Sequence, residues 1–287
     1  MSAVYRREML SYRNGLVAYV FATCLLFFAG FFTIYINLTN RSSEFQYVLI
    51  NMGFLFFIII PVLTMRTIAE ERHQKTDQLL YALPLKMSDV VLGKYLALLT
   101  VIAIPTLIIG IYPFILSRYG SVSMGTAFTS LLGFFLLAAS LSSIGVLISS
   151  MTDNQALAAG LSFVVLLLVY LMEFIKTMVP GTAQASVIAV GVLVLILALI
   201  VKFLTSDTFV ACCVALIGIS VTAICYAVKH ALFVGLFAKI ISMLSLYERF
   251  NSFSDGVLDI TGIVYYLSFI FVMLFLSVQT LEKRRWC

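Results

Sequence analysis

IPVLTMRTIAEERHQKTDQLLYALPLKMSDVVLGKYLA, residues Ile60–Ala97, is the stretch that decides the fold. Its two ends are apolar, but its centre, Ala69–Leu80, holds five charged residues and a histidine. The chain around it carries little charge. Of its 287 residues 62% are hydrophobic and 11% are charged, whereas about a quarter of a soluble domain is charged. A soluble core cannot hold this much apolar surface, so the composition predicts an all-α polytopic membrane protein.

The apolar runs give the expected membrane spans, since a helix needs about 20 apolar residues to cross the bilayer. Eight runs are candidates: Leu16–Ile36, Tyr47–Met65, Val90–Leu116, Ala127–Ser150, Ala156–Met178, Ala185–Phe203, Thr208–Val228 and Gly262–Thr280. The sixth and seventh runs can also form one re-entrant hairpin. We therefore expect about six core transmembrane helices plus an extra hairpin, about eight spans in all, in a single transmembrane domain that covers residues 1–287.

The distribution of Lys and Arg predicts which side of the membrane each loop faces. With the N-terminus in the cytoplasm, most of them fall inside: Arg6, Arg7, Arg13, Arg66, Arg72, Lys75, Lys86, Lys94, Lys202, Lys283, Arg284 and Arg285. The others fall outside or near that side: Arg41, Arg118, Lys176, Lys229, Lys239 and Arg249. This bias places both termini in the cytoplasm. It also explains the net charge of +5 without a nucleic-acid partner.

The polar segment between the second and third spans, Arg66–Asp89, is predicted to be a helix. Glu71 and Lys75 have the i,i+4 spacing that supports a helix, and leucines extend an apolar face begun by Ile68. Pro84 is expected to end this helix, and Ser88 or Asp89 to cap the third span. Alternatively, the segment is a solvated loop with an amphipathic helix on the membrane surface. Tyr5–Gly15 similarly predicts a short surface helix before the first span.

Ile60–Ala97 resembles the corresponding region of type-2 ABC exporter permeases. The elements shared with that family are Leu63–Arg66, Ala69–Glu71, Arg72, Thr76–Asp77, Leu79–Leu80, Pro84 and Gly93–Lys94. One departure is Gln74–Lys75, where the family often has a basic residue and Gly. The polar SSMTDNQALAAG, Ser149–Gly160, matches the family's second inner loop, and Tyr265–Trp286 is similar to the branch linked to gliding motility.

The resemblance implies a cytoplasmic coupling segment, residues 66–89, that docks on a separate ATP-binding subunit. The residues it assigns to this contact are Arg66, Ile68, Glu70, Glu71, Arg72, Lys75, Thr76, Asp77, Leu79, Leu80, Leu83 and Pro84. A second inner contact is expected at Thr152, Asp153, Asn154 and Gln155. The implied assembly has two ATPase subunits and a second permease, identical or homologous, in a plasma membrane, the inner membrane of a bacterium.

The sequence offers no catalytic constellation. It contains no G-x-x-x-x-G-K-[ST], H-E-x-x-H or G-x-S-x-G, so ATP and magnesium are expected on the partner subunit. The two histidines, His73 and His230, have no triad or metal partner nearby in the sequence, and the five cysteines form no C-x-x-C. We expect that the chain is not itself an enzyme and binds no cofactor.

Several features concern the membrane path. Glu173 and Lys176, three residues apart near the outer end of the fifth span, are candidates for the substrate path or for snorkelling to the interface. Pro105 and Pro113 permit kinks in the third span. Ala138, Ser142 and Gly145 give the fourth span a small-residue face, which suits close helix packing, a subunit interface or a ligand groove. Residues 229–260 are expected to form an outer amphipathic or re-entrant segment.

Three other functions are considered beside an ATP-driven exporter. An ion-coupled secondary transporter should show buried acids and broken helices repeated in two halves, and only Glu173 is a candidate. A membrane-embedded enzyme lacks its nucleophile, metal or base. A scaffold that recruits a cytoplasmic partner without transport is compatible with the same charged segment.

Overall fold

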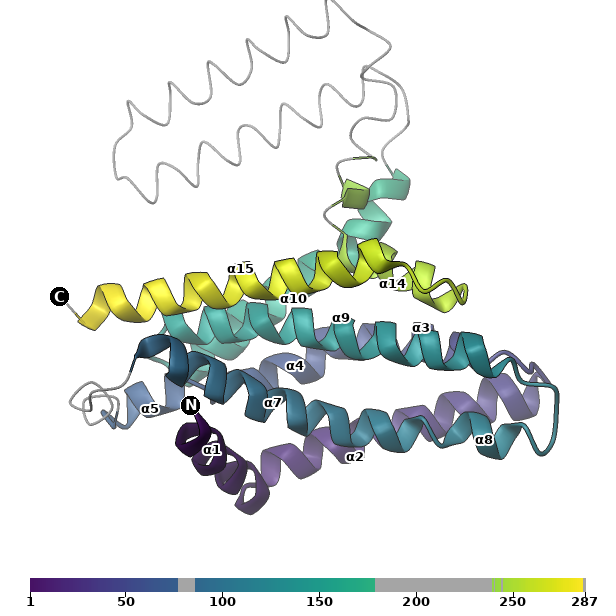
Figure 1. The fold of residues 1–287 in the computed structure, drawn as a ribbon, viewed down its shortest axis with the longest axis horizontal. Helices are drawn as coiled ribbons and strands as arrows, with labels where there is room; N and C mark the ends of the chain where they lie inside the picture. The colour runs from purple at the N-terminus through teal and green to yellow at the C-terminus, as the bar shows by residue number, and fades with distance from the viewer. Residues whose placement is uncertain (77–85, 179–238, 240, 244, 286–287) are drawn as a thin grey trace, which may run out of the picture. The chain divides into compact units, whose positions relative to one another are not determined.

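The computed structural model describes residues 1–76, 86–178, 239, 241–243 and 245–285. Every regular element in these ranges is helical (Figure 1). The elements are α1 (Ser2–Asn14), α2 (Leu16–Phe32), the π-helical η1 (Thr33–Thr39), α3 (Gln46–Met52), the 3-10 turn η2 (Gly53–Leu55), α4 (Phe56–Thr64), α5 (Ala69–His73), α7 (Met87–Ile109), α8 (Tyr112–Leu116), α9 (Met124–Met151), α10 (Gln155–Met178), α14 (Leu246–Ser254) and α15 (Ile260–Arg285). The chain divides into two compact units, Met1–Tyr170 with Leu246–Cys287, and Leu171–Ser245.

Six helices in the described ranges are long and apolar enough to cross a membrane. They are Leu16–Thr39, Gln46–His73, Met87–Leu116, Met124–Met151, Gln155–Lys176 and Ile260–Arg284. These six confirm the first five predicted spans and the last one. The predicted runs Ala185–Phe203 and Thr208–Val228 lie outside the described residues, as does most of residues 229–260.

The third span is interrupted near its second proline. α7 continues as a helix through Pro105 but ends at Ile109, and α8 begins at Tyr112. Pro113 has no N–H to donate to the carbonyl of Ile109, four residues earlier, so the helix loses a hydrogen bond at this point. The expected irregularity of the span therefore falls at Gly110–Ile111 rather than at Pro105.

α9 is the central helix of the first unit and packs against α3, α4, α7, α14 and α15 (Figure 1). Its small residues Ala138, Ser142 and Gly145 are buried, and a methyl group added at Gly145 would lie 2.7 Å from Cβ of Thr64 on α4. The Ser142 hydroxyl donates to the Ala138 carbonyl at 2.7 Å, so it leaves no unpaired polar group in the contact. The small-residue face is thus confirmed as a helix-packing surface, used by α4.

Aromatic packing holds α14 against α9 at the end where α9 begins. The ring of Phe250 lies 6.3 Å from that of Phe134, and a methyl group on Gly133 would come within 2.6 Å of Cβ of Phe253. The Tyr247 hydroxyl donates to the Gly53 carbonyl at 3.1 Å, which joins α14 to the second span. These contacts hold the helices together at one end of the unit. The opposite end is held by the ion pairs and hydrogen bonds described below.

The close approach of α4 and α9 predicts a position-dependent response to a single added methyl group. Gly145→Ala should destabilise the protein by about 1–3 kcal/mol, because α9 must move away from Thr64 to admit the methyl group. Gly160→Ala on α10 is the matched control, since nothing lies within 4 Å of the position its methyl group would take. The measurement is thermal unfolding of both variants in detergent. Equal melting temperatures for the two variants would contradict the close α4–α9 contact.

Candidate functional site

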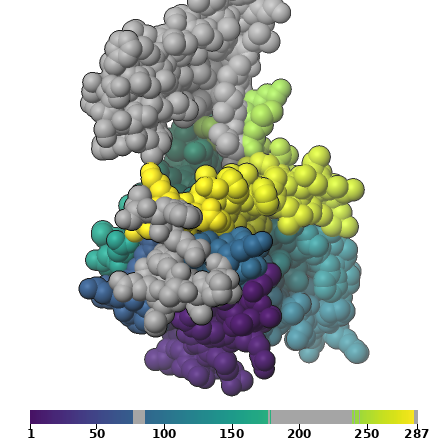
Figure 2. All heavy atoms as spheres, turned by 60° about the vertical axis from the view of Figure 1, so that its left-hand side comes forward, coloured from purple at the N-terminus to yellow at the C-terminus, as the bar shows by residue number. Residues whose placement is uncertain are grey.

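Many charged residues of the first unit lie at one end of it. Both termini, α5, the start of α7 and the end of α15 lie at this end (Figure 1). Figure 2 turns it toward the viewer and shows N-terminal atoms in purple and C-terminal atoms in yellow on one face, with blue atoms of the intervening segments between them. The site described below is the cluster of ion pairs and hydrogen bonds that joins these elements around α5.

Lys94 on α7 is the centre of the cluster. Its side chain is only 2% exposed. Its ammonium donates to Glu8 Oε1 at 2.9 Å and to the Thr67 carbonyl at 2.7 Å, and lies 3.0 Å from Glu71 Oε2. An ammonium group has three protons to donate, and here it has three oxygen partners. The charge is therefore buried but satisfied, as a buried cation must be to be tolerated.

Gly93, the residue before Lys94, explains how α1 comes close to the Lys94 ammonium. A methyl group on Gly93 would lie 3.1 Å from the side chain of Val4 and 3.2 Å from the Met1 carbonyl, so α1 lies directly against α7 here. This contact brings Glu8, one helical turn further along α1, to the Lys94 ammonium. Gly93 thus lets α1 pack closely against α7, and the next residue, Lys94, holds α1 there through its ion pair with Glu8.

Glu71 on α5 is held from two sides. Its Oε2 faces Lys94, while its Oε1 accepts a hydrogen bond of 2.7 Å from the guanidinium of Arg7 on α1. The Glu71 side chain is 14% exposed, whereas that of Arg7 is 60% exposed. Glu71 therefore belongs mainly to the interior of the protein and joins α5 to both α1 and α7.

A serine from α9 caps the start of α5. The Ser149 hydroxyl oxygen accepts hydrogen bonds from the backbone N–H groups of Ile68 at 3.2 Å and Ala69 at 3.0 Å. It also lies 3.4 Å from the Met65 carbonyl, to which it can donate. The first N–H groups of a helix lack partners within the helix, so this side chain takes the place of a local N-cap and attaches α5 to α9.

Arg72 and Arg284 converge on Asp153 in the loop between α9 and α10. Arg72 is almost fully buried and donates from Nη1 to Asp153 Oδ1 at 3.3 Å. Arg284, near the end of α15, pairs with the same oxygen and donates to the Met151 carbonyl at 2.7 Å. A cation at the C-terminal end of α9 is favoured by the helix dipole. Asp153 thus connects α5, the loop between α9 and α10, and the C-terminal helix α15.

The helix predicted over Arg66–Asp89 is confirmed over Ala69–His73, but its continuation beyond His73 is wrong. α5 ends at His73, and Lys75 has a positive φ of 56°. The N–H of Thr76 donates to the Glu71 carbonyl at 2.9 Å and that of Lys75 to the Arg72 carbonyl at 3.0 Å. This pair of bonds is a Schellman motif, which ends a helix with a left-handed residue that is usually Gly. Lys75 occupies that position, and the helical Glu71–Lys75 pair does not form.

The cap predicted for the third span is also wrong. α7 begins at Met87 with Lys86 in the N-cap position and no side-chain hydrogen bond there, so Ser88 and Asp89 fall within the first helical turn. Asp89 still places a negative charge near the positive end of the helix dipole.

The remaining predicted residues fall into three groups. In the first inner segment, Glu70 lies 3.9 Å from Arg66, and His73, Gln74 and Lys75 are exposed. The predicted residues Asp77, Leu79, Leu80, Leu83 and Pro84 lie outside the described ranges.

In the second inner loop, polar residues delimit the helices. Thr152 follows the last residue of α9, and Asn154 Oδ1 accepts a hydrogen bond of 2.9 Å from the Ala156 N–H just inside α10, which begins at Gln155. Glu173 and Lys176 lie on α10 in the second unit, each partly buried.

Most of the residues that hold the cluster together could not be predicted from the sequence. Glu8, Arg7, Ser149 and Arg284 lie far along the chain from α5, and no local pattern connects them to it. The sequence contains one relevant signal, because Lys94 is a cation within an apolar run. Such a residue needs an acidic side chain or a backbone carbonyl as its partner. In the part of the chain that the structure describes, no three His, Cys, Asp or Glu side chains are grouped so that they could hold a metal ion.

Six helices long and apolar enough to cross a membrane, among the described residues, are those of a multi-pass membrane protein, and the first unit carries an ion-paired cluster at one end. The chain belongs to the ABC-2 family of transporter proteins, because the family model "ABC-2 family transporter protein" matches residues 31–187, more than half of its length. The matched range contains α5, Lys94 and Asp153. A search of the curated proteins finds no match.

The three partners of Lys94 predict a large effect of removing its charge. Lys94→Met keeps most of the apolar side chain but leaves Glu8 and Glu71 facing each other with no cation between them, which should lower the free energy of unfolding by about 3–5 kcal/mol. The control is Lys86→Met, at an exposed lysine eight residues earlier, which should change it by about 0.5 kcal/mol or less. Denaturant titration of both variants in detergent makes the comparison, and similar losses would refute the buried lock.

Proposed function

We propose that this chain is the permease subunit of an ATP-driven exporter, and that α5 is the element through which a separate ATP-binding subunit drives it. One observation carries the proposal. α5 lies at the charged end and is joined to α1 by Glu71–Arg7, to α7 by Glu71–Lys94 and to α9 by Ser149. A force applied to this five-residue helix would reach three other helices through short polar contacts.

The charged end is proposed to face the cytoplasm. The structure brings Arg6, Arg7, Lys94 and Arg284 to the same end of the first unit, and an excess of Lys and Arg marks cytoplasmic loops. This orientation places α5 where ATP is available to a partner. It also agrees with both termini lying inside.

The surface proposed for docking is narrower than the set of charges in the sequence. Glu71 and Arg72 are occupied by contacts within the permease, whereas His73, Gln74 and Lys75 are exposed directly after them. These three residues are polar or cationic, so they suit an interface with an acidic or hydrogen-bonding surface. The proposed contact continues into the leucines after Asp77, and Thr152–Gln155 form its second part.

The proposed division of labour follows from the same contacts. The partner subunit holds ATP and magnesium and performs the hydrolysis, while this chain binds no cofactor and catalyses no reaction. Closure of two such subunits would move α5, and Lys94 would carry that motion into α1 and α7. Arg72 would carry it to the loop before α10 and, through Asp153, to α15.

The wider assembly rests on the family resemblance. We propose a pair of permeases, identical or homologous, in a plasma membrane such as the bacterial inner membrane, related to the gliding-motility branch. Glu173 and Lys176 on α10 are the proposed contacts of the substrate path.

Docking at the exposed turn after α5 is tested by reversing one charge. Lys75→Glu keeps the internal contacts of Glu71 and Arg72 but places an acid where a cation is proposed to meet the partner, so retention of the ATPase should fall by roughly tenfold. The measurement is affinity purification of the permease in mild detergent, with mass spectrometry to identify a co-purifying P-loop protein and an assay of its ATP hydrolysis.

Arg118→Glu is the matched control, because Arg118 is an exposed cation just after α8, away from the charged end. It should retain as much ATPase as the wild type. If no ATPase accompanies the wild-type protein, or if Lys75→Glu retains it fully, the proposed coupling fails. An ion-coupled transporter or a non-transporting scaffold then becomes the better explanation.

A further inference from the structure

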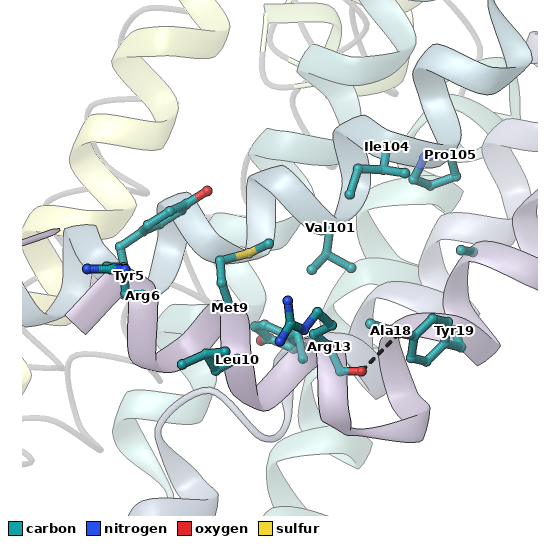
Figure 3. A pocket seen from close by; sticks show the side chains of 12 residues that line it. Tyr5, Arg6, Met9, Leu10, Arg13, Ala18, Tyr19, Val101, Ile104 and Pro105 are labelled. Atoms are coloured by element: carbon teal, nitrogen blue, oxygen red, sulfur yellow. Dashed lines mark hydrogen bonds between the residues drawn. The ribbon is translucent and has the colours of Figure 1, made fainter. Parts of the chain in front are cut away.

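An apolar groove with a cavity volume of about 520 Å³ runs between α1, α2 and α7 (Figure 3). Such a volume falls within the range of about 300–1,000 Å³ that is typical of small-molecule sites. Its apolar lining comes from three helices and includes Met9, Leu10, Ala18, Val101, Ile104 and Pro105. The groove lies beside the cluster around Lys94 but shares none of its ion-paired residues.

Two arginines border the apolar lining. Arg6 and Arg13 both lie on α1, seven residues apart, so they project from the same side of the helix about 10 Å from each other (Figure 3). Both are exposed, and neither makes an ion pair with any residue that the structure describes. Glu8, the acid nearest to them along the chain, is occupied by its ion pair with Lys94. The groove therefore carries two positive charges that form no ion pair with the residues that the structure describes.

The position of the groove relates it to the bilayer. α2 and α7 belong to membrane spans, and α1 precedes the first span at the charged end. Leu10 on α1 is 50% exposed and Leu16 at the start of α2 is 79% exposed, as expected for residues that contact lipid. A helix with exposed apolar residues and arginines lies in the interface between head groups and acyl chains. The apolar lining thus faces the acyl-chain depth and the arginines face the head groups.

We propose that the groove binds an anionic glycerophospholipid of the surrounding membrane, with an acyl chain against α2 and α7 and the phosphate on Arg6 and Arg13. Charge selects the occupant. A free anion would leave the apolar lining uncovered, an uncharged apolar molecule would leave both arginines unpaired, and a zwitterionic lipid would bring its own cation to them. Basic pockets between membrane helices commonly hold anionic head groups.

A lipid in this position would stabilise the seating of α1. The same helix contacts α7 through Val4 at Gly93 and supplies Glu8 and Arg7 to the cluster that holds α5. Lipid binding itself does not depend on the proposed transport function, because the groove and its arginines are present in the permease alone. Loss of the bound lipid would weaken the attachment of α1 without removing any residue of the cluster.

The test measures which lipid the purified permease retains. The wild-type protein is exchanged into detergent that contains equal amounts of dioleoyl phosphatidylglycerol and dioleoyl phosphatidylcholine, and bound lipid is counted by native mass spectrometry. The wild type should retain phosphatidylglycerol preferentially. Arg6→Gln/Arg13→Gln should reduce this preference by about 25-fold, since each arginine near an anionic head group contributes about fivefold. Arg118→Gln, an exposed arginine away from the groove, should leave the preference unchanged.

Two further experiments distinguish lipid binding in the groove from lipid or phosphate binding elsewhere on the protein. Ala22→Phe, a substitution of a residue that lines the groove, should abolish retention while keeping both arginines. Glycerol 3-phosphate added in excess should not displace the lipid, because it has no acyl chain. All variants should elute as the wild type on gel filtration. The proposal fails if the wild type shows no preference, if either groove variant retains the lipid normally, or if glycerol 3-phosphate displaces it.

Discussion

The buried ammonium of Lys94 is the constraint on which the charged end of this permease depends. A cation removed from water loses several kcal/mol of solvation, and only well-placed acceptors recover it. Its three acceptors come from three different parts of the chain: Glu8 on α1, the carbonyl of Thr67 before α5, and Glu71 within α5. Because all three must be present at once, α1, α5 and α7 can occupy only a narrow set of relative positions. Gly93 permits this arrangement by letting α1 touch α7.

This constraint changes the way the charged segment is understood. The acids and arginines of α5 look like a docking surface in the sequence, but Glu71 and Arg72 serve to attach α5 to its own subunit. Among the described residues of this segment, the exposed turn His73–Lys75 is the surface that we propose for a partner. A coupling element needs both parts, since a helix that docks without being attached would move without moving the spans. In the proposed coupling, Glu71 and Arg72 thus serve attachment, and recognition is left to the exposed residues.

The spans could be predicted because each is a run of about 20 apolar residues, a signal contained in the sequence itself. The end of α5 could not, because Lys75 takes a left-handed conformation that the i,i+4 pattern of Glu71–Lys75 does not reveal. The Gly that the family often has at this place was the available sign of a turn, and its replacement by Lys75 obscured that sign. The cluster could not be predicted either, since Glu8 and Ser149 lie 86 and 80 residues along the chain from the groups they bind. Long-range ion pairs leave no periodic trace.

The most direct test of the central claim is a double-mutant cycle between Lys94 and Glu71. The free energy of unfolding in detergent is measured for the wild type, Lys94→Met, Glu71→Gln and the double variant. If the buried ion pair locks α5 to α7, removing both charges should cost less than the sum of the single losses, with a coupling energy of about 1.5–3 kcal/mol. Losses that add to within about 0.5 kcal/mol would show that the two residues act independently, and α5 would then lack the attachment that its proposed role requires.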